Sequence, residues 1–149
     1  TLATNYKCSF LTYYKKQIWT GNFEYTKNGT LRSYTILNPN SENTTLKERS
    51  SVTLPPAVQG ITFATGGKLI VSRAYGYTNE LDIYKPSKPG TTSMRLGKRL
   101  KKITMPALNE GIAINGAYLY VNFESGLPGS LALNHMDRIL ALKLKAILK

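Results

Sequence analysis

The feature that most constrains the fold is an internal repeat of about 50 residues. Segment 52–63 matches segment 103–114 at a constant offset of 51 residues. Each copy has an apolar–Thr–apolar–Pro strand end, a short linker, an amide or acidic residue followed by glycine, and then alternating apolar residues. This pattern predicts two strands in each copy, because proline cannot donate to a ladder and alternation with period two is typical of strands.

Two further strands recur after the matched segment. The second strand of the unit recurs at 17–24, 68–75 and 118–124, and the third recurs at 31–36, 81–85 and 138–144. Segment 138–149 alternatively fits an amphipathic helix, although its place in the repeat favours a strand. The unit is therefore four short strands, present about three times.

Glycines occupy two kinds of position in this repeat. Gly66-Gly67 and Asn115-Gly116 predict two-residue hairpins, because Gly and Asn tolerate positive φ. Gly60 and Gly111 enter the innermost strand, where we expect neighbouring units to crowd and a Cβ not to fit.

Four strands in about 50 residues are typical of a propeller blade. We predict an all-β chain, a single β-propeller segment of about three four-stranded antiparallel blades, with repeats at approximately 1–50, 51–101 and 102–149. Closed propellers need about four to eight blades, so we expect half of a six-bladed propeller. The remaining blades would come from another copy, another chain or a removed part of the same precursor. A self-contained β-sandwich is the alternative.

The chain carries a formal net charge of +12, from 20 Lys and Arg against 8 Asp and Glu. Such a charge suits an acidic polymer or an anionic surface, or it only aids solubility. One stretch of eight residues contains five cations that predict polyanion binding, namely Arg95, Lys98, Arg99, Lys101 and Lys102. A solvated loop between repeats is the alternative for this stretch. We do not expect nucleic acid as the partner, because the sequence has no phosphate-cradling glycine motif.

Histidine and cysteine are too scarce for several kinds of catalytic site. Cys8 and His135 are the sole residues of their types, which excludes an internal disulfide and leaves few ways to build a His-dependent triad or a zinc site. The sequence also contains no apolar run of about 20 residues that would span a membrane. The first residues lack an initiator methionine and a signal-peptide pattern, so we expect a processed or trimmed chain, on an extracellular or cell-surface protein.

Segment 58–72 resembles the blade core of NHL-like, strictosidine-synthase-like and SMP-30/gluconolactonase-like propellers, and segments 109–114 and 118–122 resemble the same pattern. The resemblance covers all three repeats and is specific to the architecture. In lactonase-like members it implies a divalent cation such as Ca²⁺ in the central channel, here with Glu110, Asn22 and Asn122 as ligands. Gln59 replaces the acid in the middle repeat and Arg73 replaces the Asn.

Several polar and aromatic residues are candidates for ligand binding. The triplet Asn-Phe-Glu occurs at both 22–24 and 122–124, at equivalent positions of the repeat, and an Arg lies near a Tyr in the segment 73–75. The predicted ligand-binding set is Asn22, Glu24, Gln59, Arg73, Tyr75, Glu110, Asn122 and Glu124. Alternatively, Asn caps a turn, Glu pairs with a nearby Lys, and the Arg and Tyr pack together.

The sequence therefore favours a non-catalytic binding or scaffold module that completes a propeller with other blades. The first alternative is a metal-assisted hydrolase of the lactonase or esterase type. The second is a basic module that binds a polyanion.

Overall fold

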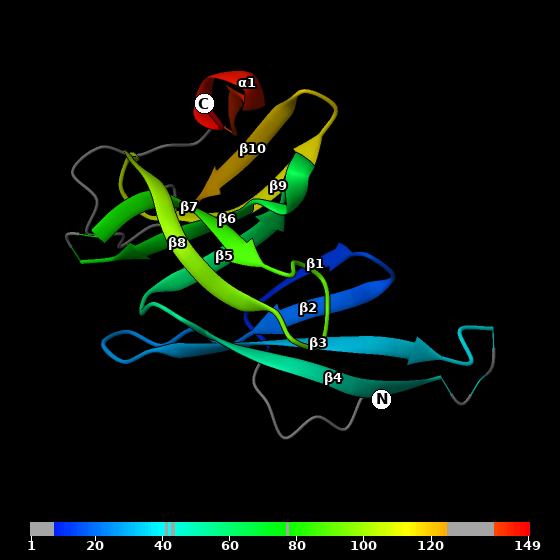
Figure 1. The fold of residues 1–149 in the computed structure, drawn as a ribbon. Helices are drawn as coiled ribbons and strands as arrows, with labels where there is room; N and C mark the ends of the chain where they lie inside the picture. Colours follow the sequence, from blue (N-terminus) through cyan, green and yellow to red (C-terminus); the bar gives the residue numbers. More distant parts are fainter. Residues whose placement is uncertain (1–7, 41, 43, 77, 125–138) are drawn as a thin grey trace.

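The computed structural model describes residues 8–40, 42, 44–76, 78–124 and 139–149, which form three antiparallel sheets (Figure 1). The first sheet contains β1 (Phe10–Tyr14), β2 (Gln17–Gly21), β3 (Gly29–Leu37) and β4 (Thr45–Leu54). The second contains β5 (Val58–Phe63), β6 (Leu69–Tyr75), β7 (Thr78–Ser87) and β8 (Arg95–Thr104). The third contains β9 (Asn109–Asn115), β10 (Tyr118–Phe123) and β11 (Leu140–Lys143). The predicted all-β class is confirmed.

Each sheet is a meander whose strands pair in sequence order, as the repeat predicts. The first two sheets have four strands, and the third has three in the described residues. Residues 139–149, the described part of segment 138–149, contain both predicted elements: β11 pairs with β10, and a single helical turn, α1 (Leu144–Ile147), follows β11. A 3₁₀ turn, η1 (Thr65–Gly67), connects β5 to β6.

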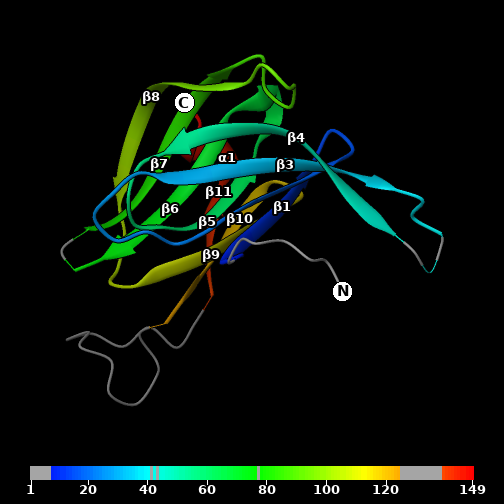
Figure 2. The same ribbon diagram turned by 90° about the horizontal axis from the view of Figure 1, so that it is seen from below.

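The second sheet lies between the other two (Figures 1 and 2). Side chains alternate along β6, so that Leu69 and Val71 join the apolar cluster shared with the first sheet, whereas Ile70 joins the cluster shared with the third. Trp19 of β2 and Leu119 of β10 are fully buried in these two clusters. Strand β6 is therefore apolar on both faces, as expected for a strand in the middle of the stack.

The repeat extends to the backbone conformation. Ala57 and Leu108, which are 51 positions apart, both have positive φ, at 64° and 59°. The carbonyl of Ala57 accepts the amide of Ala74 at 2.9 Å, and that of Leu108 accepts the amide of Glu124 at 3.0 Å. The entries to β5 and β9 therefore share one turn geometry as well as one sequence pattern.

The first strands of the three sheets, β1, β5 and β9, lie side by side (Figure 2). At Gly60 of β5, a Cβ would lie 2.7 Å from the carbonyl oxygen of Glu110 and 3.1 Å from the amide nitrogen of Ile112. At Gly111 of β9, it would lie 2.6 Å from Oδ1 of Asn122. The predicted crowding by a neighbouring unit is confirmed at Gly60, whereas at Gly111 the close contact is with Asn122 on β10 of the same sheet.

The two predicted hairpins differ in detail from the structure. Tyr118 pairs with Asn115, so the two-residue loop is Gly116-Ala117 and Asn115 still belongs to β9. The prediction of a two-residue turn at Gly66-Gly67 is wrong, because η1 makes that connection longer. Gly67 there packs against Pro89, whose Cγ would lie 2.4 Å from an added Cβ.

We expect Gly60→Ala to lower the free energy of unfolding by about 1–3 kcal/mol, because the new methyl group would collide with the backbone of β9. Gly29→Ala on β3 is the matched control, since a Cβ there meets its nearest atom at 3.5 Å. Denaturant titrations of both variants measure the difference. Equal stability of the two variants would contradict the close approach of β5 and β9.

Candidate ligand pocket

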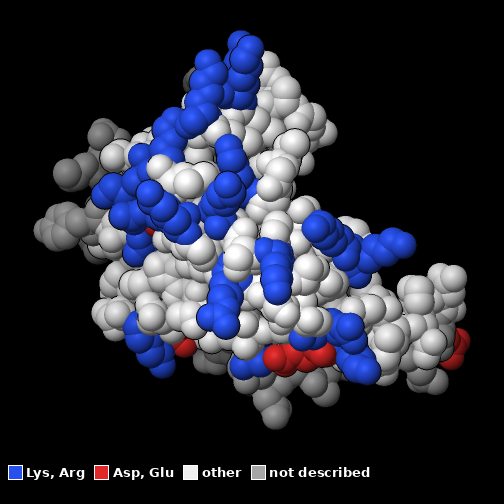
Figure 3. All heavy atoms as spheres, in the orientation of Figure 1, with Lys and Arg blue, Asp and Glu red and all other residues white. Residues whose placement is uncertain are grey.

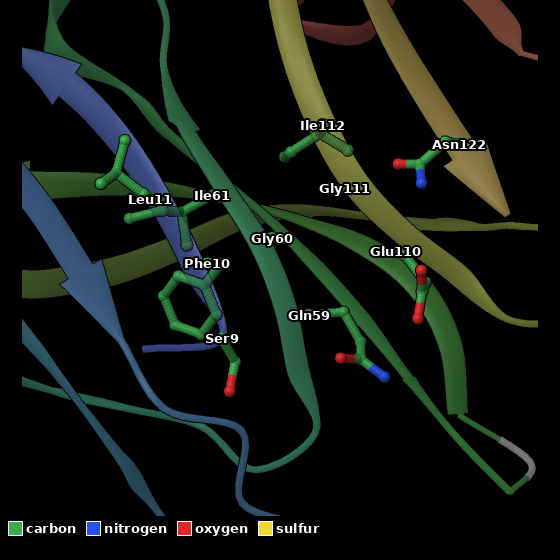
Figure 4. Close-up of a pocket in the computed structure, with 10 residues that line it drawn as sticks. All are labelled: Ser9, Phe10, Leu11, Gln59, Gly60, Ile61, Glu110, Gly111, Ile112 and Asn122. Carbon is green, nitrogen blue, oxygen red and sulfur yellow. The ribbon is translucent and has the colours of Figure 1, made fainter. Parts of the chain in front are cut away.

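The first strands of the three sheets border a pocket of about 250 Å³ (Figure 4). Its lining residues come from the start of β1 and from β5, β9 and β10: Ser9, Phe10, Leu11, Gln59, Gly60, Ile61, Glu110, Gly111, Ile112 and Asn122. Because Gly60 and Gly111 have no side chains, the strands approach closely there, and the flanking side chains form the walls. Figure 4 shows the side chains of Gln59 and Glu110 on one side of this crossing.

The pocket brings together three of the predicted ligand-binding residues, namely Gln59, Glu110 and Asn122. Two amide side chains and one carboxyl group supply both hydrogen-bond donors and acceptors. Phe10 and Ile61 supply apolar wall. This arrangement suits a small polar molecule with hydroxyl or amide groups.

Glu110 is the electrostatically unusual group of the pocket. Burial raises the pKa of the Glu110 carboxyl group above its ordinary value, and repulsion from the Glu124 carboxylate and a hydrogen bond with it raise the pKa further. Glu124, a fourth predicted residue, therefore acts on the pocket through Glu110. A carboxyl group that keeps its proton more readily can donate a hydrogen bond to a ligand.

The remaining residues of the predicted set lie outside the residues that line this pocket. Nδ2 of Asn22 donates to Oε1 of Glu24 at 2.7 Å, and Glu24 also pairs with Lys27 at 3.5 Å. Tyr75 stacks on Tyr25 with ring centroids 4.9 Å apart. The Glu24–Lys27 pair matches the alternative of a local ion pair, whereas the stacking of Tyr75 on Tyr25 was not predicted. A binding role for Asn22, Glu24 and Tyr75 stays a prediction.

Arg73 belongs to a charged network between the first and second sheets. Its guanidinium group donates to the carbonyl of Pro56 at 2.8 Å, to Oδ2 of Asp82 at 3.1 Å and to Glu80. Asp82 is fully buried and also accepts from Arg99 at 3.2 Å. Arg73 therefore has buried structural partners, and its binding role also stays a prediction.

The three predicted calcium ligands do not line one pocket. Glu110 and Asn122 line the pocket described above, and Asn22 does not. Among the described residues, no group of three or more His, Cys, Asp or Glu is placed to hold a metal ion. Because Ca²⁺ takes six to eight oxygen ligands, the described part of the chain does not by itself fit a calcium site. His135 lies outside the described residues.

Sequence reasoning missed the residues that connect the sheets. Nδ2 of Asn109 donates to Oγ of Ser72 at 2.7 Å and to the carbonyl of Glu80 at 3.2 Å, which joins β9 to the second sheet. Asp82 alternates with Leu81 and Ile83 in β7, a pattern typical of a polar residue on an exposed face, so the sequence carried no signal of the buried ion pairs that Asp82 forms. The contribution of Ser9, Phe10 and Leu11 to the pocket had no comparable signal, because it depends on how the sheets stack.

Comparison with known protein families, curated proteins and solved structures found no significant match. Among the described residues, no helix is long and apolar enough to cross a membrane.

We expect the Glu110 carboxyl group to make stability depend on pH. Because its pKa is higher in the folded state, its stabilising contribution is complete below the unfolded-state pKa of about 4.3 and is lost as the pH rises through the folded-state pKa. Glu110→Gln stays neutral and should flatten this part of the profile, with greater stability than the parent at neutral pH. Denaturant unfolding of the parent and of Glu110→Gln, between acidic and neutral pH, measures this difference in the free energy of unfolding.

Glu48→Gln is the control for this experiment, because Glu48 is exposed and pairs with Arg32 at 2.6 Å. Loss of this ion pair should leave the free energy of unfolding at neutral pH unchanged or lower it by up to about 1 kcal/mol. The effect of Glu48→Gln is therefore opposite in direction to the effect expected for Glu110→Gln. A Glu110→Gln variant that is less stable than the parent at neutral pH would show that the carboxylate form is preferred.

Proposed function

We propose that the chain is a β-propeller segment, the equivalent of half a six-bladed propeller, and that it serves as a non-catalytic binding or scaffold module of a secreted or cell-surface protein. In this proposal its two end faces pack against further blades. The observation that carries it is the stack of three meanders, whose first strands lie together and whose end faces expose apolar side chains.

The outer face of the third sheet is largely apolar, with Lys143 of β11 at its edge, opposite Tyr118. Leu119 and Val121 of β10 are buried towards the second sheet, and the alternate residues Tyr118 and Tyr120 are each 37% exposed. Ile139 is 66% exposed. A groove on this face is lined by Ala113, Tyr120 and Ile139, among others. Such a face resembles half of an interface between sheets.

The outer face of the first sheet is apolar at its β1–β2 side, and the Arg32–Glu48 ion pair lies on the same face at the β3–β4 side. Trp19 of β2 is buried towards the second sheet, while Ile18 faces the other way, beside Tyr13 of β1. Leu11 and Tyr13 are 60% and 63% exposed. Leu69, which occupies the position of Ile18 in the next repeat, is fully buried between two sheets. An additional blade would bury Ile18 in the same way.

The pocket at the first strands supports the binding role. It lies beside the first strands of the three sheets, and it carries Gln59, Glu110 and Asn122. The metal-assisted hydrolase would need further ligands from the missing blades, and no observation in the described residues favours it over a binding pocket.

We expect the isolated chain to associate as its concentration rises, measured by light scattering coupled to size-exclusion chromatography. Tyr120→Lys on the third sheet and Leu11→Lys on the first should each weaken association about tenfold or more, because a lysine would be desolvated in an apolar interface. Leu100→Lys is the control, since Leu100 is also exposed but lies on β8, away from both end faces.

Circular dichroism should show the same strand content in all three variants, because each replaced side chain is exposed. A folded chain that stays monomeric at every concentration and binds no other chain would overturn the proposal. So would equal weakening by Leu100→Lys.

A further inference from the structure

Lys and Arg side chains gather in a band over β8 and towards the C-terminal end of the chain (Figure 3). Strand β8 carries all five cations of the predicted polyanion-binding stretch, and Lys85 on β7 pairs across from Lys98. Four of the five side chains on β8 are exposed, and that of Lys101 is half-buried. The stretch is thus a strand rather than the solvated loop that was the alternative.

The nearby acidic residues form ion pairs with only some of the cations in this band. Asp82 is fully buried and pairs with Arg99, while Glu80 pairs with Lys102 at 3.3 Å. Among the described residues, Arg95 and Lys98 form no ion pair. These two cations therefore lack a carboxylate partner within the described part of the chain.

The geometry of β8 turns neighbouring cations outward. Its register with β7 shifts at two places, between Ile83 and Tyr84 and between Lys85 and Ser87. Gly97 has φ of 73°, and a Cβ there would lie 2.2 Å from the carbonyl oxygen of Lys85. Such irregularities bend and twist a strand. The four consecutive residues 97–100 are consequently all exposed, instead of alternating between surface and core.

The band continues from β8 onto the C-terminal segment. Nζ of Lys101 donates to the carbonyl of Ala146 at 3.4 Å, which places α1 beside β8. Lys143, Lys145 and Lys149 are exposed in this segment. Within the described residues, β8 pairs only with β7, so its other edge also offers backbone N–H groups to a ligand.

We propose that β8 and the C-terminal segment form a binding track for a flexible linear polyanion that carries repeating phosphate groups. Ten residues of strand span about 33 Å, which is long enough for several phosphates to bind at once. Because β8 is twisted and curved (Figure 1), a flexible chain can follow it more closely than a planar membrane can. The part of the track on β8 is independent of the blade assembly, since β8 is the outermost strand of the middle sheet.

Inorganic polyphosphate with a fluorescent label is the first probe, and its anisotropy is measured against the full chain. We expect affinity to fall about 10³-fold between 50 and 200 mM salt, as for about six phosphate contacts. Lys98→Glu should weaken binding about tenfold, because it removes one attraction and adds one repulsion on the track. Lys27→Glu changes the net charge equally, and its side chain is 75% exposed on the β2–β3 loop, so it should weaken binding at most about twofold.

Two further probes distinguish the source of the phosphate. Oligothymidylate of equal charge should bind with similar affinity if phosphates alone are recognised, and more tightly if bases also contact the track; both results support a polyanion track. Equal weakening by Lys27→Glu and Lys98→Glu would overturn the proposal, because only net charge would then matter. Binding to phosphatidylserine vesicles without binding to either polymer would overturn the polyanion track in favour of a membrane surface. Absence of binding to any of the three probes would also overturn it, and would show that the cations only protect a sheet edge.

Discussion

The contact of β5 with β9 at Gly60 is the constraint on which the arrangement of the sheets depends. An added Cβ at this glycine would lie 2.7 Å from the carbonyl oxygen of Glu110, so the two first strands approach each other at backbone distance. The last strands, β4 and β8, lie at the other side of their sheets. The convergence of the first strands creates a polar pocket beside Gly60, and β8, at the far edge of its sheet, has four exposed cations.

A buried charge network complements this apolar stack. Asp82 lies between sheets with no exposed surface and interacts with Arg73, Arg99 and the hydroxyl group of Tyr84. Burial, followed by the charge of Asp82, raises the pKa of the Tyr84 phenol, so this group stays a neutral donor. Removal of one partner from such a network leaves an uncompensated charge in the interior. The network therefore favours one alignment of β6, β7 and β8 over alignments shifted by a residue.

The sequence predicted what depends on local pattern and missed what depends on the stacking of sheets. The match of 52–63 with 103–114 was sufficient to predict the strands and the crowding at Gly60, because alternation, proline and glycine act within a few residues. The partners of Arg73 and Asn109 were not predictable, since they come from other strands and from another sheet. The longer connection at Gly66-Gly67 was missed for the same reason, because Pro89 packs against it from far along the chain.

The distribution of charge connects the two proposals. The end faces that carry Leu11 and Tyr120 are rich in apolar side chains, whereas the cations concentrate on β8 and near the C-terminal end. Because exposed charges further apart than about 8–10 Å are screened at physiological salt, the five cations of β8 oppose contact between end faces only weakly. The same separation leaves β8 accessible after the end faces have been covered. A chain with these two surfaces can therefore join further blades and bind a polyanion at the same time.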